Sequence, residues 1–193
     1  VGVTLNGDAV GRITAAGGDQ IFSSGSITMT GTSVFELNGF NEQVNNLNSA
    51  VATTVIRNGH ATNASTLSVG GGNGSSTFAG VIENGGAAAM GIAQNGTGTL
   101  TLTNNNTYTG TTALNASGGG ITLNFAAAEG THDNLVSASS ALSFTNTSAV
   151  RTQILTVTGD AGVINNQTFN GTTFAATAGR KYQIVTSSGV GGT

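Results

Sequence analysis

Apolar and polar residues alternate one by one in short runs along this chain, and "NG", "GG" and "GD" steps separate the runs. Alternation with a period of two indicates β-strands that bury one face, and the separating residues tolerate the backbone angles of tight turns. No segment shows the 3.6-residue apolar repeat of a helix. The sequence therefore predicts an all-β fold. The predicted strands are residues 26–30, 65–69, 76–82, 99–103, 121–125, 141–144, 153–158, 167–174 and 182–186.

The segment "NEQVNNLNSAVATTVI" (41–56) is the closest to a helix. Its asparagines and β-branched residues are poor helix formers. We expect a strand, a turn and a second strand here.

Two architectures are compatible with strands spaced by about ten residues or slightly more: an antiparallel sandwich or barrel, and a parallel β-solenoid. Aromatic residues make up 5% of the chain, which is low for a sandwich core. Asparagine and threonine ladders stabilise strands that stack in register, and the chain is rich in both residues, including "NNN" at 104–106. The composition favours the parallel β-helix (β-solenoid).

The run "TLTLT" illustrates the expected wall of such a fold. Leu100 and Leu102 should face the core, while Thr99, Thr101 and Thr103 face outward, where β-branched residues suit the pleated surface. The following "NNNTYTG" should form a turn whose asparagine side chains bond to backbone groups.

Length and composition restrict the function. The 193 residues predict a single domain, 1–193, and the net charge of -3 excludes a basic nucleic-acid surface or a polybasic membrane patch. No apolar run approaches the roughly 20 residues of a membrane helix. The absence of cysteine excludes disulfides without fixing the compartment. Because the chain starts at Val1, it is interpreted as a mature form or a piece of a longer precursor.

Three consecutive segments, "FELNGFNEQVNNLNS", "STLSVGGGNGSSTFAGVIENGG" and "GTGTLTLTNNNTYTGTT", resemble the autotransporter-associated β-strand repeat family of bacterial surface proteins, also called the passenger-associated transport repeat. The likeness lies in the order of a "FAGVI" strand, a glycine turn, a "GTLTLT" strand and "NNTYTGTT". A looser similarity continues downstream, so the resemblance covers roughly residues 34–185. It implies a right-handed parallel β-helix that is secreted or displayed on a bacterial surface. The sequence contains neither a membrane barrel domain nor a passenger catalytic module.

At about 20 to 25 residues per coil, the chain would make roughly eight or nine coils. At the usual strand spacing the stack would be roughly 40 Å long. The terminal segments "VGVTLNG" and "TSSGVGGT" carry no proline and almost no charge. Open strand edges without such residues favour pairing with another chain, so we expect copies of the protein to stack end to end.

The charged residues form no catalytic motif. Glu129 and Asp133 are the nearest pair of carboxylates for sugar cleavage, and His132 with Ser137, Ser139 or Ser140 is the nearest approach to a Ser-His-Asp set. Both sets are better explained by a polar loop, "EGTHDN", because no "GxSxG" elbow is present. We predict no enzymatic activity.

Metal and phosphate sites are not expected either. His60 has no second ligand at a suitable spacing. The "GGGNGSSTF" stretch (70–78) has serine where calcium-binding nonapeptides need aspartate, and it lacks the lysine of a phosphate loop. It should be a glycine corner between coils, and no cofactor is predicted.

These features predict a non-catalytic extracellular structural module, either a fibre subunit or a passenger stalk. The alternative is an adhesin that binds polysaccharide or a host surface. The scarcity of aromatic residues speaks against this alternative, because sugar sites commonly stack rings on aromatic faces and the chain has only two tyrosines for that role, Tyr108 and Tyr182.

Overall fold

The protein is all-β, and every strand pairing among the described residues is parallel. The structure, a computed structural model, describes residues 2–14, 20–115, 118–128, 133–145, 151–175 and 179–187. Within these ranges there is no α-helix, and one short 3₁₀ helix, η1 (Phe125–Ala127), follows a strand. The parallel pairing excludes the antiparallel sandwich or barrel for the described strands.

The strands of the described residues form four sheets. The first contains β1 (Val3–Leu5), β3 (Ser26–Met29) and β6 (Asn46–Asn48), and the second contains β2 (Val10–Arg12), β4 (Val34–Glu36), β7 (Val55–Arg57) and β10 (Val81–Glu83). The third contains β5 (Glu42–Val44), β8 (Ser65–Val69), β11 (Met90–Gln94), β13 (Thr112–Leu114), β15 (Leu142–Phe144) and β17 (Thr172–Phe174). The fourth contains β9 (Ser76–Phe78), β12 (Thr99–Leu102), β14 (Gly120–Asn124), β16 (Thr152–Thr158) and β18 (Lys181–Ser187).

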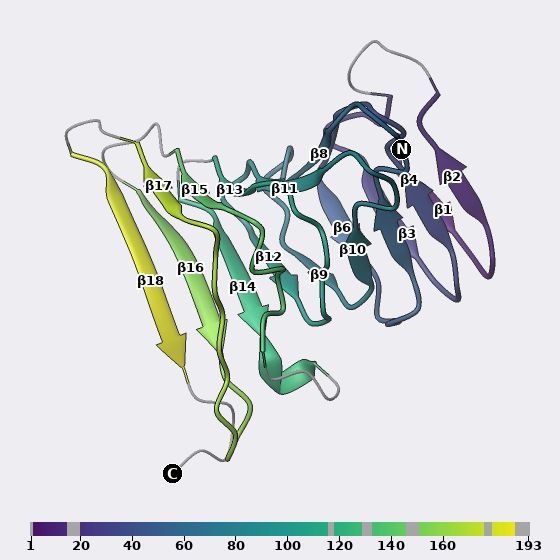
Figure 1. Ribbon diagram of the computed structural model, residues 1–193. Coiled ribbons are helices and arrows are strands. Elements are labelled where there is room, and N and C mark those ends of the chain that lie inside the picture. Colours follow the sequence, from purple (N-terminus) through teal and green to yellow (C-terminus); the bar gives the residue numbers. More distant parts are fainter. Residues whose placement is uncertain are drawn as a thin grey trace.

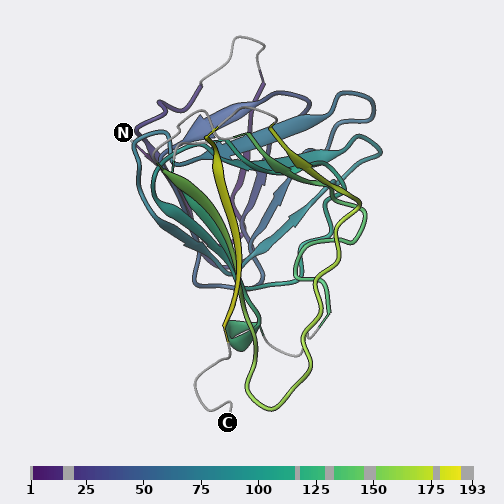
Figure 2. The same cartoon turned by 90° about the vertical axis from the view of Figure 1, so that its left-hand side faces the viewer.

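The first and fourth sheets continue each other through a parallel bridge between Ser49 and Phe78. The strands therefore follow one another in a long row, from β1 at one end to β18 at the other (Figure 1). Figure 2, turned so that the β18 side faces the viewer, shows the strands of each sheet lying behind one another. Successive parallel neighbours bring together residues twenty or more positions apart in sequence, such as Val3 with Ile27 and Ile27 with Leu47.

The core lies between the sheets and is built from the inward side chains of each strand. One row of these residues runs through registered neighbours along the first and fourth sheets, and its apolar members Ile27, Leu47, Leu100, Ile121 and Leu155 are each at most 1% exposed. Burying one such side chain contributes roughly 1.5–3 kcal/mol. The alternation of the sequence thus selects which face of each strand points inward.

Asparagine side chains add hydrogen bonds to backbone groups between the regular strands. Asn106 is fully buried, and its Nδ2 donates hydrogen bonds to the carbonyl oxygens of Leu135 (2.9 Å) and Asn104 (2.6 Å). Its Oδ1 accepts a hydrogen bond from the backbone N–H of Ile82 (2.9 Å). The expectation that asparagine side chains of the "NNNTYTG" segment bond to backbone groups is confirmed, and these bonds satisfy buried groups that would be costly to leave unpaired. The expected turn is not formed: the segment bends at Asn104 and Gly110, and Asn106 lies in a parallel bridge with Val136.

Most of the predicted strands are present, but two predictions were wrong in extent. Residues 76–82 form two strands, β9 and β10, in different sheets, because the chain bends at Gly80, where a Cβ would lie 2.2 Å from Thr54 Oγ1. Of residues 167–174, strand structure is limited to β17, which begins just after Gly171 with its φ of +84°. The segment 41–56 contains strands and no helix, as expected.

The "TLTLT" run follows its predicted pattern with one exception. Leu100 and Leu102 are fully buried, and Thr99 and Thr101 are partly exposed. Thr103, expected outside, is 9% exposed, because it lies in a hollow that Asn104 and Ala127 also line.

Candidate functional site

The carboxylates and serines considered for catalysis do not form a reactive cluster in the described residues. Glu129 and His132 lie outside the described residues. Asp133 is exposed, pairs with Asn166 in an isolated bridge, and its Oδ1 accepts a hydrogen bond from Asn166 Nδ2 (2.7 Å). The carboxylate of Asp133 therefore contacts the side-chain amide of Asn166, which is a structural partner.

The serines near Asp133 have structural contacts. Ser137 Oγ accepts a hydrogen bond from the backbone N–H of Ser139 within a turn. Ser140 is fully buried, and its hydroxyl bonds to Gly110 O (2.7 Å) and Thr112 Oγ1 (2.9 Å). A buried hydroxyl held this way stabilises the packing of neighbouring strands.

Tyr108 is not available to stack on a sugar ring. It is fully buried, and its hydroxyl lies 2.7 Å from Thr112 Oγ1 in the same hydrogen-bonded chain as Ser140. Burial raises the pKa of Tyr108 well above its usual value, an effect that the Thr112 hydrogen bond opposes. Tyr182 is half-buried, and its ring packs at a tilt against Phe144 and Phe174.

His60 serves as a local cap. Its Nδ1 accepts hydrogen bonds from the backbone N–H groups of Thr62 (3.1 Å) and Asn63 (2.9 Å). In the part of the chain that the structure describes, no group of three or more histidine, cysteine, aspartate or glutamate side chains could hold a metal ion. In the 70–78 stretch, the glycine-rich first part forms a turn with positive φ at Gly70 and Asn73, as expected for a corner, and Ser76–Phe78 belong to β9.

Sequence reasoning missed a row of alternating charges. The strands β2, β4, β7 and β10 end with Arg12, Glu36, Arg57 and Glu83, which lie in register with one another. The Glu36 carboxylate is 5% exposed and forms ion pairs with both arginines, including a hydrogen bond of 2.6 Å from Arg57 Nε. The recurring triplets "VGR", "VFE", "VIR" and "VIE" are the signal that could have found it.

Glu36→Gln is expected to lower the free energy of unfolding by about 1–3 kcal/mol at pH 7, because two arginines lose their shared carboxylate. Burial acts to raise the pKa of Glu36, but the hydrogen bonds and charges of Arg57 and Arg12 outweigh it and hold the pKa below its usual 4.5. A carboxyl with a lowered folded pKa stabilises above its unfolded pKa, and the gain is lost as pH falls through the folded value.

Urea denaturation of both proteins between pH 7 and pH 3 checks this prediction. The difference should shrink as the pH falls below about 4. Glu83→Gln, one strand further along and in neither ion pair, is the matched control. A Glu36→Gln deficit that is independent of pH would contradict the electrostatic explanation.

The β18 end of the row is the most distinctive surface of the described structure. Phe174 of β17 is 49% exposed, Ile184 of β18 is 54% exposed, and Ile164, in the segment between β16 and β17, is 80% exposed. Both β17 and β18 are edge strands, each with a neighbour on one side in its sheet. Together Phe174, Ile184, Ile164 and the edges of β17 and β18 form what we name the β18 end surface.

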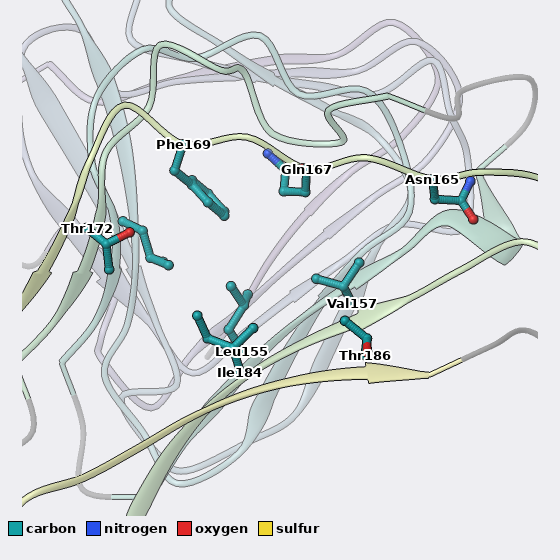
Figure 3. Close-up of a pocket in the computed structure, with 9 residues that line it drawn as sticks. Leu155, Val157, Asn165, Gln167, Phe169, Thr172, Ile184 and Thr186 are labelled. Atoms are coloured by element: carbon teal, nitrogen blue, oxygen red, sulfur yellow. The ribbon is translucent and has the colours of Figure 1, made fainter.

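A cavity of about 260 Å³ opens beside this surface, between the β15–β17 sheet and the β16–β18 sheet. Figure 3 shows Phe169 and Gln167 from the connecting segment on one side and Leu155, Val157 and Ile184 on the other. The walls are predominantly apolar and none of the lining residues is charged. Such a space suits aliphatic side chains better than a charged ligand.

An aromatic stack is formed by residues of β15, β17 and β18, three strands that also contribute lining residues to the cavity. The rings of Phe144 and Phe174 are parallel within 9° with centroids 5.1 Å apart, and Tyr182 packs at a tilt against both. Phe144 is fully buried, whereas Phe174 is half exposed. The stack therefore ends at a ring with room for a further apolar contact.

These features define the protein as an all-β chain of parallel, registered strands with an apolar end surface. No described segment forms a helix with the length and apolar character needed to cross a membrane. No family model, no curated protein and no solved structure matches this chain. The resemblance to the autotransporter-associated repeat family accordingly stays a prediction.

Proposed function

We propose that this chain is a non-catalytic extracellular structural module: a stiff, right-handed β-solenoid that serves as the subunit of a self-assembling bacterial surface fibre or as a passenger stalk. One observation carries the proposal, namely the continuous parallel register from β1 to β18. If each of β1, β3, β6, β9, β12, β14, β16 and β18 belongs to one coil, there are eight coils, within the range expected from the sequence. At the usual strand spacing they give a rod of roughly 40 Å.

The physical basis of stiffness is the satisfaction of backbone groups between coils. Each parallel pair supplies hydrogen bonds along the rod, and buried asparagines such as Asn106 and Asn58 supply them between the regular strands. A chain whose backbone groups are paired in this way offers few sites for local opening and for proteases. This supports a mechanical role outside the cell, which the family resemblance also implies.

The adhesin alternative has less support. Its two sugar-stacking candidates, Tyr108 and Tyr182, are packed inside the structure or against other aromatic rings. The structural role needs no such site. It depends on strand register and on the ends of the rod.

Electron microscopy of the purified chain, combined with diffraction from oriented specimens, tests the proposed function. We expect filaments or short rods in which strands lie across the long axis, with a reflection near 4.8 Å along that axis. Resistance to trypsin and to a non-specific protease should accompany this order. Rapid digestion throughout the chain, or strands running along the rod axis, would contradict the proposal.

A further inference from the structure

The row of inward-facing residues that crosses the strands ends at β18, where no further strand of the described structure packs over it. Through registered neighbours this row runs from Val3 through Ile27, Leu47, Ser76, Leu100, Ile121 and Leu155 to Ile184. The apolar members between the two end strands are at most 1% exposed, but Ile184 is 54% exposed. A parallel strand laid over β18 would bury Ile184 in the same way that β16 and β14 bury each other's side chains.

The strand that fits this position is β1 of a second copy. β1 is itself an edge strand with inward Val3 and Leu5, two residues apart, matching Ile184 and Thr186 on β18. Val10 of the neighbouring edge strand β2 is 61% exposed, on the outward face where Val34 and Val55 hold the registered positions. Strand addition of this kind gains hydrogen bonds along the whole edge.

Charge does not oppose this contact. β1 contains no charged residue, and in the matched register its outward Thr4 lies over Val185. Beyond Val185, Thr4 would then continue an outward row that is mostly threonine: Thr28, Asn48, Thr77, Thr101, Thr122 and Thr156. The cavity beside Leu155 and Ile184, with its uncharged walls, lies next to the added strand and can accept aliphatic side chains from the same copy.

We propose that β1 of one molecule pairs in parallel with β18 of the next, with Val3 over Ile184 and Leu5 over Thr186, and that this junction repeats head to tail. The inference rests on the proposed function, since it specifies the contact through which the structural subunit assembles. Because the two surfaces on each molecule differ, the junction does not close on itself and gives an open filament.

Paired cysteines test the junction, and the natural chain contains no cysteine that could interfere. In the double variant Thr4→Cys/Val185→Cys, both thiols point outward. At the proposed junction, the thiol at position 4 of one molecule and the thiol at position 185 of the next would lie on adjacent strands. Adjacent strands are about 4.8 Å apart, within the Cα separation that a disulfide spans. Mild oxidation should give a ladder of dimers, trimers and longer species on a non-reducing gel.

The matched control is Thr4→Cys/Thr101→Cys, because Thr101 already has Thr77 and Thr122 as strand neighbours and is not at an end. It should stay monomeric. Adding Ile184→Asp to the Thr4→Cys/Val185→Cys variant should reduce cross-linking at least about tenfold, by placing a charge in the apolar contact. A double variant that stays monomeric, or a control that cross-links equally, would overturn the junction.

The two proposals fail differently. A monomeric, protease-resistant particle without cross-links would exclude the β1–β18 junction and leave the stalk form of the proposed function standing. A chain that proteases digest rapidly and that forms no cross-links would refute both.

Discussion

Phe78→Ala is expected to lower the free energy of unfolding by about 3–5 kcal/mol, the usual loss for a buried phenylalanine. Phe78 is fully buried and pairs in register with Leu102. It also forms the parallel bridge with Ser49 that joins the first and fourth sheets. Removing its ring leaves a cavity between strands whose backbones are fixed by hydrogen bonds on both sides, so little of it can collapse.

Chemical denaturation followed by circular dichroism measures this effect. Thr77→Ala is the matched control, since Thr77 is the adjacent, exposed residue of the same strand. It should change the free energy of unfolding by no more than about 0.5 kcal/mol. Equal losses in the two variants would mean that the inward and outward faces of β9 have been assigned incorrectly.

Gly96→Ala is expected to destabilise the protein by about 1–3 kcal/mol or more, although it adds one methyl group. A Cβ at Gly96 would lie 2.0 Å from the carbonyl oxygen of Gly70, and one at Gly119 would lie 2.0 Å from the carbonyl oxygen of Gly96. These three glycines stack backbone on backbone. Because the obstacle is main chain, no side-chain rotation relieves the contact.

The melting temperature should fall by about 2–4 °C per kcal/mol for a chain of this size. Gly91→Ala is the comparison, since its Cβ would lie 3.1 Å from the nearest atom, the Thr111 carbonyl oxygen, and a small shift would accommodate it. A Gly96→Ala variant as stable as Gly91→Ala would contradict the close stacking of these turns.

The sequence predicted the strands whose two faces differ strongly. In 65–69 and 99–103, apolar residues alternate with threonine or serine, and strands occur there. β11 was not predicted, because its sequence, "MGIAQ", does not alternate between apolar and polar residues. All five of its residues are buried, and Gly91 lies against the neighbouring chain segment. The bend at Gly80 was not predicted either, because it depends on the close approach of Thr54, which is distant in sequence.

The candidate site was harder to predict than the fold. The charge row of Arg12, Glu36 and Arg57 requires a register between strands, and single-sequence spacing does not reveal which residues become neighbours. The burial of Tyr108 likewise depends on packing by segments that follow it, which hold Ser140 beside Thr112. The sequence predicted open strand edges at the ends of the fold. Which apolar residues lie at the β18 end surface could be seen only in the structure.

Disulfide mapping of β14 against β16 tests the parallel register most directly. The variants Thr122→Cys/Thr156→Cys and Asn124→Cys/Thr158→Cys join residues that face each other in this pair. Both should oxidise to intramolecular disulfides, detected by mass spectrometry. The crossed variants Thr122→Cys/Thr158→Cys and Asn124→Cys/Thr156→Cys should stay reduced, since diagonal Cα atoms are about 8 Å apart, beyond the reach of a disulfide. Disulfides in the crossed variants and not in the direct ones would mean that the strands run antiparallel, and a stack of parallel coils would then be refuted.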